Sequence, residues 1–283
     1  MILVNLGCGP VWHPDWQNFD IQPRPPHVGR MDLRRPLPFH DATVDAVYHS
    51  HVLEHLPPAT AAQLLRECHR VLRPGGVLRV GVPDLEGVTR AYLLALEAVT
   101  GGGDAFLHDW AVAELLDQCV REHSGGLMAT LMREATPEQL AHIESRVGGE
   151  DARRARLARR ERLAELLRGL PAGAQARWLL GFAANQAWLA TTEALLAVVA
   201  GPRARRQLRV GRFRTSGEVH QWMYDRFSLE RSLRAAGFEG VVVREPGESA
   251  IPGFGDHGLE MLHGRARKPE SLYVEGFRPS PAS

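Results

Sequence analysis

The sequence contains few cysteines and carries almost no net charge. Its 283 residues include three cysteines, Cys8, Cys68 and Cys119, which lie far apart and form no C-x-x-C pair. Such usage is typical of a reducing compartment and argues against a structural zinc site. The 34 Lys and Arg residues nearly balance the 33 Asp and Glu residues, giving a net charge of +1. We therefore expect a cytoplasmic protein with no bound metal and no polyanionic partner.

Long apolar runs are missing as well. Residues 2–6 are mostly apolar but lead at once into Gly7, so the stretch is too short for a signal peptide or a membrane span. No later stretch reaches the roughly 18 uninterrupted apolar residues that spanning requires, which predicts no integral membrane association. With 44% hydrophobic and 24% charged residues, the chain can still bury a core, as one domain with an insertion or as two small domains.

Short apolar segments separated by turns dominate the first third of the chain. The predicted strands cover residues 2–6, 17–21, 44–49 and 77–82, and a further element ends near residues 31–33. Residues 60–72 repeat apolar side chains at helical spacing, and the run Pro74, Gly75 and Gly76 is expected to stop this helix. Strands that alternate with helices or crossovers predict an α/β fold with a mostly parallel, doubly wound sheet, which binds ligands at the carboxyl ends of its strands.

Helical composition replaces this pattern from about residue 88 to 205. We interpret this region as a helical insertion or cap, in which residues 151–168 are rich in arginine. An exposed helix face explains these arginines better than a phosphate site does. Residues 178–200 are apolar on most helix faces, which predicts that they are buried against the core or against a partner subunit.

The sheet pattern returns after residue 220. A helix is predicted at 228–236, with Ser228 as its N-cap, and strands are predicted at 241–244 and 272–275. The expected division of the chain is a core at 1–87, the helical insertion at 88–205, and a segment at 206–283 that completes the sheet.

Two glycines follow the first predicted strand directly. Gly7 and Gly9 stand where backbone must approach a ligand closely, although such a turn can end a strand in any α/β protein. Asp20 closes the second strand, where a carboxylate can accept hydrogen bonds from both hydroxyls of a ribose. At the next strand end, Asp32 can accept from an adenine amino group while Leu33 packs on the ring. Solvated loop carboxylates are the alternative for both acids.

A longer run of motifs follows these positions. Residues 32–86 combine D-L-x-x-P-L-P-F, V-L-E-H-L and R-V-L-R-P-G-G-x-L-R, and this run closely resembles the methyltransferase-11 type of class I S-adenosylmethionine-dependent methyltransferases. The resemblance implies a Rossmann-like, seven-stranded, mostly parallel sheet with an antiparallel final strand. It also implies S-adenosylmethionine as the cofactor. The residues expected to bind this cofactor are Leu6, Gly7, Cys8, Gly9, Asp20, Asp32, Leu33, Ser50 and His51.

The sequence departs from this family between the first two strands. The usual third glycine is missing, and only ten residues, Pro10 and Pro14 among them, separate the two strands. A crossover helix does not fit in this length, so the link should be a loop or a single turn. Asp20 follows Gly9 by 11 residues, whereas a nicotinamide site usually places its acid about 20 residues on. This spacing weakens a dehydrogenase interpretation.

Histidines around the fourth predicted strand are the candidate bases. Methyl transfer to a hydroxyl needs a base, and an imidazole can take a proton at neutral pH. His51, at the strand tip, is the preferred residue, and it shares an orientation with His49 if the strand continues, with Ser50 opposite. His55 is a second candidate. The alternative for His49 and His55 is a structural role, His55 capping or packing the following helix.

Further candidates lie outside this strand. His220 and Trp222 belong to an aromatic and polar cluster that would form an acceptor wall or ordinary core. Asp84 follows the fifth strand at the carboxyl edge of the sheet, where it would orient the acceptor or cap the next helix. Asp117 and Arg121 share one helix face of the insertion, and we expect that pair to be solvated.

The second half of the chain carries another resemblance. Residues 115–126, 216–238, 248–254 and 268–276 look like uncharacterised bacterial methyltransferases associated with cell-surface glycan assembly. This implies a small-molecule, sugar or glycan acceptor, methylated at oxygen in a pocket that the insertion supplies. N- or C-methylation of another metabolite, or a non-catalytic cofactor-binding scaffold, remains an alternative. A nucleic-acid substrate is disfavoured because no N/D-P-P-Y/F motif follows the fourth strand. The oligomeric state is open, a homodimer being one option.

Overall fold

A single seven-stranded sheet organises the computed structural model, which describes residues 1–156 and 172–280. The strand order is β3-β2-β1-β4-β5-β9-β6. The strands of this sheet are β1 (Leu3–Leu6), β2 (Gln17–Asp20), β3 (Val28–Arg30), β4 (Val44–Ser50), β5 (Leu72–Pro83), β6 (Glu239–Arg244) and β9 (Ser271–Phe277). β9 runs antiparallel to both β5 and β6, while β1 to β5 pair in parallel. The predicted Rossmann-like, mostly parallel sheet is therefore confirmed.

The central strands are apolar because both of their faces are covered. Val4 pairs with Val47, which pairs in turn with Leu78, and all three side chains are fully buried. Helix α1 (Pro58–Val71) places Leu64 and Leu65 in the same core cluster. Burying an aliphatic side chain of this size contributes about 1.5–3 kcal/mol. This packing holds the carboxyl ends of β1, β2 and β4 at one edge of the sheet.

Two predicted element boundaries were wrong. Helix α1 ends at Val71 and the chain passes straight into β5 at Leu72, so Pro74–Gly76 lies within the strand and does not stop the helix. The register of β5 against β4 shifts at this point, which accommodates the proline that lacks an N–H donor. Helix α9 (Arg226–Ala235) is capped by Asp225, whose carboxylate accepts from the Ser228 backbone N–H at 2.7 Å. Ser228 is the third residue of the helix and the partner of Asp225 in this capping box, not the N-cap.

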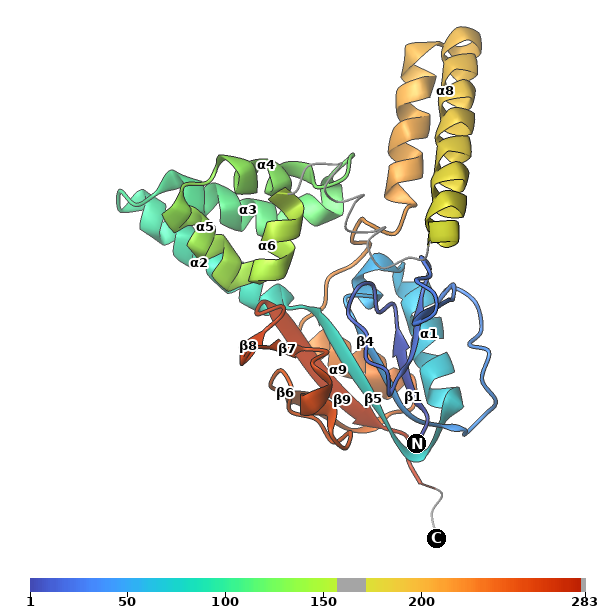
Figure 1. Cartoon of the computed structure of the whole chain (residues 1–283). Coiled ribbons are helices and arrows are strands. Elements are labelled where there is room, and N and C mark those ends of the chain that lie inside the picture. Colours follow the sequence, from blue (N-terminus) through green and yellow to red (C-terminus); the bar gives the residue numbers. More distant parts are fainter. Residues whose placement is uncertain (157–171, 281–283) are drawn as a thin grey trace.

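Helices make up most of the described residues between β5 and α9. They are α2 (Leu85–Thr100), α3 (Ala105–Val120), α4 (Gly126–Glu134), α5 (Pro137–Val147), α6 (Gly149–Arg156) and α8 (Ala172–Arg214), and the short 3-10 helices η1 (Leu53–His55) and η2 (Phe254–His257) lie in other loops. Helices α2 to α6 gather beyond the carboxyl end of β5 (Figure 1). They have a core of their own, in which Trp110 and Ile143 are fully buried. A two-stranded ribbon of β7 (Met261–Leu262) and β8 (Arg265–Ala266) precedes β9.

Helix α8 is a projecting hairpin (Figure 1). Its helical backbone is interrupted at Gly201, which has a φ of 82°, and Pro202 follows. Leu180, Trp188 and Val198 are 71%, 60% and 85% exposed. The prediction that 178–200 is buried against the core is therefore wrong, because a second helical arm can cover only one face of an arm that is apolar all round. Within the described residues no helix is long and apolar enough to span a membrane. Residues 157–168 of the arginine-rich segment lie outside the described residues.

Candidate functional site

The turn after β1 is shaped by glycine. Gly7 and Gly9 have φ values of +62° and +53°, which side-chain-bearing residues rarely adopt. A Cβ atom on Gly7 would lie 2.4 Å from Cγ2 of Val52, so no other residue fits there. The Gly9 backbone N–H donates to Oδ2 of Asp20 at 2.9 Å. Residues 7–16 contain turns and no helix, which confirms the loop predicted between the first two strands.

The two predicted acids differ in their surroundings. Asp20 stands at the end of β2, and its Oδ1 accepts from the Gln22 backbone N–H at 2.8 Å. Asp32 instead forms an ion pair with Arg34 at 2.8 Å, and this partner lowers the pKa of Asp32 to about 2. Leu33 lies beside the loop, 3.7 Å from the position of a Cβ atom on Gly7. The structure therefore gathers Asp20 and Leu33 at the glycine turn.

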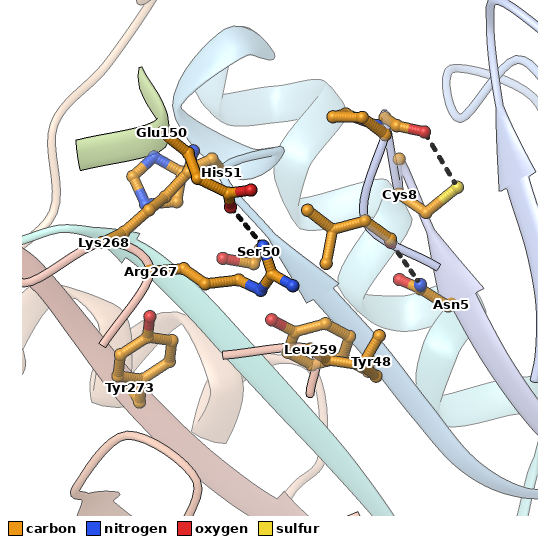
Figure 2. A pocket seen from close by; sticks show the side chains of 14 residues that line it. Asn5, Cys8, Tyr48, Ser50, His51, Glu150, Leu259, Arg267, Lys268 and Tyr273 are labelled. Carbon is orange, nitrogen blue, oxygen red and sulfur yellow. Dashed lines mark hydrogen bonds and ion pairs between the residues drawn. The ribbon is translucent and has the colours of Figure 1, made fainter. Parts of the chain in front are cut away.

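A cavity of about 330 Å³ opens beside this turn. Its walls include residues 7–11 of the loop, Ser50 and His51 at the end of β4, and Tyr273 of β9 (Figure 2). Gly7, Cys8, Gly9, Ser50 and His51 are the predicted residues that line it. The other predicted cofactor positions, Leu6, Asp20, Asp32 and Leu33, are outside its lining.

Several lining residues were missed by reasoning from the sequence. Glu150 of α6 and Arg267 form an ion pair at the cavity, and Tyr48 and Tyr273 stand below them (Figure 2). Arg267 and Glu150 are far apart along the chain, and neither carries a motif. The alternation of β9 does signal that Tyr273 faces one side of the sheet, although nothing in the sequence says that a cavity lies there. Glu150 shows that the helical insertion contributes to the cavity wall.

His51 ends the fourth strand in an unusual backbone conformation. Its φ is +56°, so the strand alternation stops at Ser50 and the predicted shared orientation of His49 and His51 is wrong. The Nδ1 atom of His51 lies 3.2 Å from Oε1 of Glu54, and its Nε2 atom lies 2.7 Å from the Ser271 hydroxyl. His49 is fully buried, and burial lowers its pKa to about 4. Of these two histidines, His51, which follows β4, is the one that lines the cavity.

Glu54 is a fully buried carboxylate among histidines. His55 Nε2 lies 3.8 Å from its Oε1 atom, and the rings of His55 and His220 are 4.8 Å apart. Burial disfavours ionisation of Glu54, but contact with His51 and the charges of the other histidines outweigh it and lower its pKa to about 2. Burial likewise lowers the pKa of His220 to about 3. Three predicted catalytic residues, His51, His55 and His220, therefore surround Glu54.

Asp84 occupies a different position. Its carboxylate accepts from the Glu86 backbone N–H at 3.0 Å and caps helix α2, and burial raises its pKa. Asp84 therefore caps the next helix, which was the alternative to orienting the acceptor. Asp117 is buried and the Arg121 side chain is 9% exposed, so the expectation that the pair is solvated is wrong. Asp117 accepts from the Leu127 backbone N–H of α4 at 2.8 Å, and Arg121 donates to the Glu218 carbonyl at 2.9 Å.

Part of the chain resembles known methyltransferases in sequence. Residues 17–80 match the family model described as a methyltransferase domain. A probable S-adenosylmethionine-dependent methyltransferase of Mycolicibacterium smegmatis is 48% identical over 59 residues, which are 19% of this chain and 22% of that protein. An uncharacterised 37.1 kDa protein in transposon Tn4556 of Streptomyces fradiae is 45% identical over 56 residues, 20% of this chain and 16% of that protein. The matched region thus spans less than a quarter of either relative.

Solved structures with related topology share little sequence. A methyltransferase of Archaeoglobus fulgidus is 11% identical over 97% of this chain and 85% of its own, with a TM-score of 0.37. One of Thermotoga maritima, described as a possible histamine N-methyltransferase, is 11% identical over 98% and 82%, with a TM-score of 0.36. TM-scores this low support no inference about individual residues or substrates. Residues 17–80 are thus similar to a methyltransferase domain, and the M. smegmatis relative that matches part of this chain is described as S-adenosylmethionine-dependent.

Proposed function

We propose that this chain is an S-adenosylmethionine-dependent methyltransferase that binds its cofactor along the glycine turn. The observation that carries the proposal is the turn itself: Gly7 admits no Cβ atom, and Asp20 accepts from the Gly9 backbone N–H at 2.9 Å. This places open backbone and a carboxylate together at the carboxyl edge of the sheet, where such folds bind nucleotides. The match of residues 17–80 to a methyltransferase domain supports it.

The residues present fit such a cofactor. Asp20 has lone pairs left on both oxygens for ribose hydroxyls, and Leu33 offers an apolar surface to a base beside the turn. Ser50 and His51 line the cavity next to the turn, where they would contact the methionine part. The bound cofactor supplies a methyl group on a positively charged sulfur. Asp32 is held by Arg34, so an adenine contact from Asp32 uses the lone pairs that this ion pair leaves.

The acceptor we propose is a hydroxyl of a small molecule, sugar or glycan, with His51 as the base. While the cofactor would supply the methyl group to the acceptor oxygen, Nε2 of His51 would take the proton that the acceptor hydroxyl gives up. Ser271 holds this nitrogen at 2.7 Å until an acceptor displaces it. Glu54, 3.2 Å from Nδ1, is the positioning residue because a buried carboxylate stabilises the imidazolium that forms.

The helical insertion has a defined part in this proposal. Glu150 of α6 reaches the cavity and pairs with Arg267, and Lys268 also lines it. Polar and charged groups at the mouth of a cavity suit a hydroxyl-rich acceptor, which supports a sugar or glycan over an apolar metabolite. His55 and His220 contribute through their contacts with Glu54, and Asp84 contributes through the cap of α2.

The test begins with isothermal titration of S-adenosylmethionine, S-adenosylhomocysteine and NAD. Binding of the first two and not of NAD is expected, and binding of NAD alone would refute the cofactor assignment. Sugar and glycan acceptors are then screened with radiolabelled cofactor. His51→Gln should lose roughly 10²–10⁴-fold in turnover and much less in cofactor affinity; equal losses would mark His51 as a binding residue only. His40→Gln, at an exposed site, is the matched control. Cofactor binding without turnover on any acceptor would favour the non-catalytic scaffold.

A further inference from the structure

Glu54 has more histidine neighbours than the positioning of one catalytic base, His51, requires. Glu54, His55 and His220, which we call the His–Glu cluster, each offer one ligand atom, and these atoms lie within 4.8 Å of one another. Two of the residues come from η1, and His220 comes from the segment before α9. The chain holds these parts together through the Glu54 carbonyl, which accepts from the Gln221 backbone N–H at 2.6 Å.

The Glu54 carboxylate is poorly supplied with hydrogen-bond donors. Among the described residues, neither of its oxygens accepts a hydrogen bond, although both are fully buried. His51 Nδ1 approaches Oε1 at 3.2 Å, a distance that gives charge attraction without completing the bonding of the other oxygen. An unpaired buried carboxylate is strongly destabilising, so native proteins pair such groups or place them on a metal. Among the described residues the Oε2 atom of Glu54 therefore has no donor, and a bound cation would satisfy it.

The chemistry of the cluster fits a divalent transition metal. A carboxylate and two imidazoles form the three-residue set of many zinc sites, in which water takes the fourth position. Each residue of the cluster offers one ligand atom to a common point, and such ligands bind a metal in their deprotonated forms. Tetrahedral zinc places its ligand atoms roughly 3.3 Å apart, given bonds of about 2.0 Å. The ligand atoms of the cluster lie within 4.8 Å of one another, and rotation of the His55 side chain, which is 24% exposed, can bring them to this shorter spacing.

We propose that Glu54, His55 and His220 bind one divalent transition-metal ion, with Zn²⁺ the best match. The ion would neutralise the buried charge of Glu54 and join η1 to the segment that follows the helical insertion. His51 is not one of its ligands: its Nε2 atom bonds to the Ser271 hydroxyl, while its Nδ1 atom approaches the same Glu54 carboxylate at 3.2 Å. The proposal does not depend on methyl transfer, because metal binding is measured without cofactor or acceptor.

A second histidine group supplies an internal control. His13, Asp15 and His257 also lie within 4.8 Å of one another, but Asp15 is 68% exposed. His257 Nδ1 already accepts the Trp16 indole N–H at 2.9 Å. Because water and a hydrogen bond already satisfy these groups, we expect this set to bind metal weakly or not at all. We therefore expect the His–Glu cluster to bind metal and the group of His13, Asp15 and His257 not to, although their residue types are similar.

The experiment uses the whole chain, stripped with a chelator and then titrated with Zn²⁺ by calorimetry. We expect one Zn²⁺ per chain, a rise in the thermal midpoint, and the visible spectrum of four-coordinate Co²⁺ when Co²⁺ replaces Zn²⁺. His220→Gln and Glu54→Gln should each weaken binding by on the order of 100-fold, while His13→Gln should leave it unchanged. No binding, or loss only in His13→Gln, would overturn the proposal.

Buried substitutions can also prevent folding, so a measurement on the unaltered chain is needed. Crystals grown with Zn²⁺ and measured at the zinc absorption edge locate the ion directly. An anomalous peak bounded by Glu54, His55 and His220 would support the proposal. A peak elsewhere, or none, would overturn it whatever the variants do.

Discussion

Asp20→Asn tests the cofactor site most directly. Asp20 accepts from the Gly9 backbone N–H through Oδ2 and from the Gln22 backbone N–H through Oδ1, at 2.9 and 2.8 Å. Asparagine keeps the size of the side chain but removes its charge and turns one acceptor into a donor. The NH2 group of asparagine would then either face a backbone N–H, with which it cannot form a hydrogen bond, or take the place of an acceptor for a ribose hydroxyl. A hydrogen bond to a charged group contributes about 1.5–3 kcal/mol.

This energy converts to a measurable change in affinity. A loss of about 1.5–3 kcal/mol corresponds to a dissociation constant raised roughly 10- to 150-fold, which titration with S-adenosylhomocysteine can resolve. Asp109→Asn, at a site 65% exposed on α3, is the matched control and should leave affinity unchanged. Equal thermal midpoints for the two variants would show that the fold is intact. If Asp20→Asn binds within twofold of the parent protein, Asp20 does not hold the ribose.

Three other changes test the turn, the core and the acid response. Gly7→Ala should weaken cofactor binding at least tenfold in the same titration, because its Cβ would meet Val52 at 2.4 Å; an equal affinity would contradict this. Arg79→Met leaves Glu260 and Glu275 buried without the cation they share. It should lower the free energy of unfolding by roughly 3–5 kcal/mol, seen as an earlier urea midpoint, and an unchanged midpoint would rule out the ion pair as a stabiliser. Burial lowers the pKa of His49 from 6.5 to about 4, so the unfolded chain takes up the proton first and stability falls as pH drops through this range. His49→Leu should reduce that slope by about one proton, and an unaltered slope would show that another group causes it.

The central sheet was predictable because its signals are local. Val4, Val47 and Leu78 belong to apolar runs whose length and flanking glycines identify buried strands, and Gly7 marks the turn by residue type alone. Asp20 could be placed because the end of a strand fixes the edge of the sheet where its side chain lies. The resemblance then supplied the number of strands and the antiparallel final strand, which periodicity cannot give.

The cavity and the His–Glu cluster were beyond local reasoning. Arg267 and Glu150 meet across the cavity only because the helical insertion returns to the sheet. His220 reaches Glu54 through the contact of two distant segments, and the left-handed backbone of His51 redirects its ring in a way that strand alternation does not anticipate. Apolar residues 178–200 indicated a helix correctly, but apolarity does not say what covers it.

The pairing of β5 with β9 sets an order on the assembly of the site. Val77 pairs with Phe277 and Val82 with Leu272, so closing this part of the sheet spans the whole helical insertion. A closure this long is slow compared with the folding of local helices. While a ribosome is still making the chain, β5 has an unpaired edge that can associate with other strands. Tyr273 joins the cavity wall only with β9, so a nascent chain has no complete cavity until that last pairing forms.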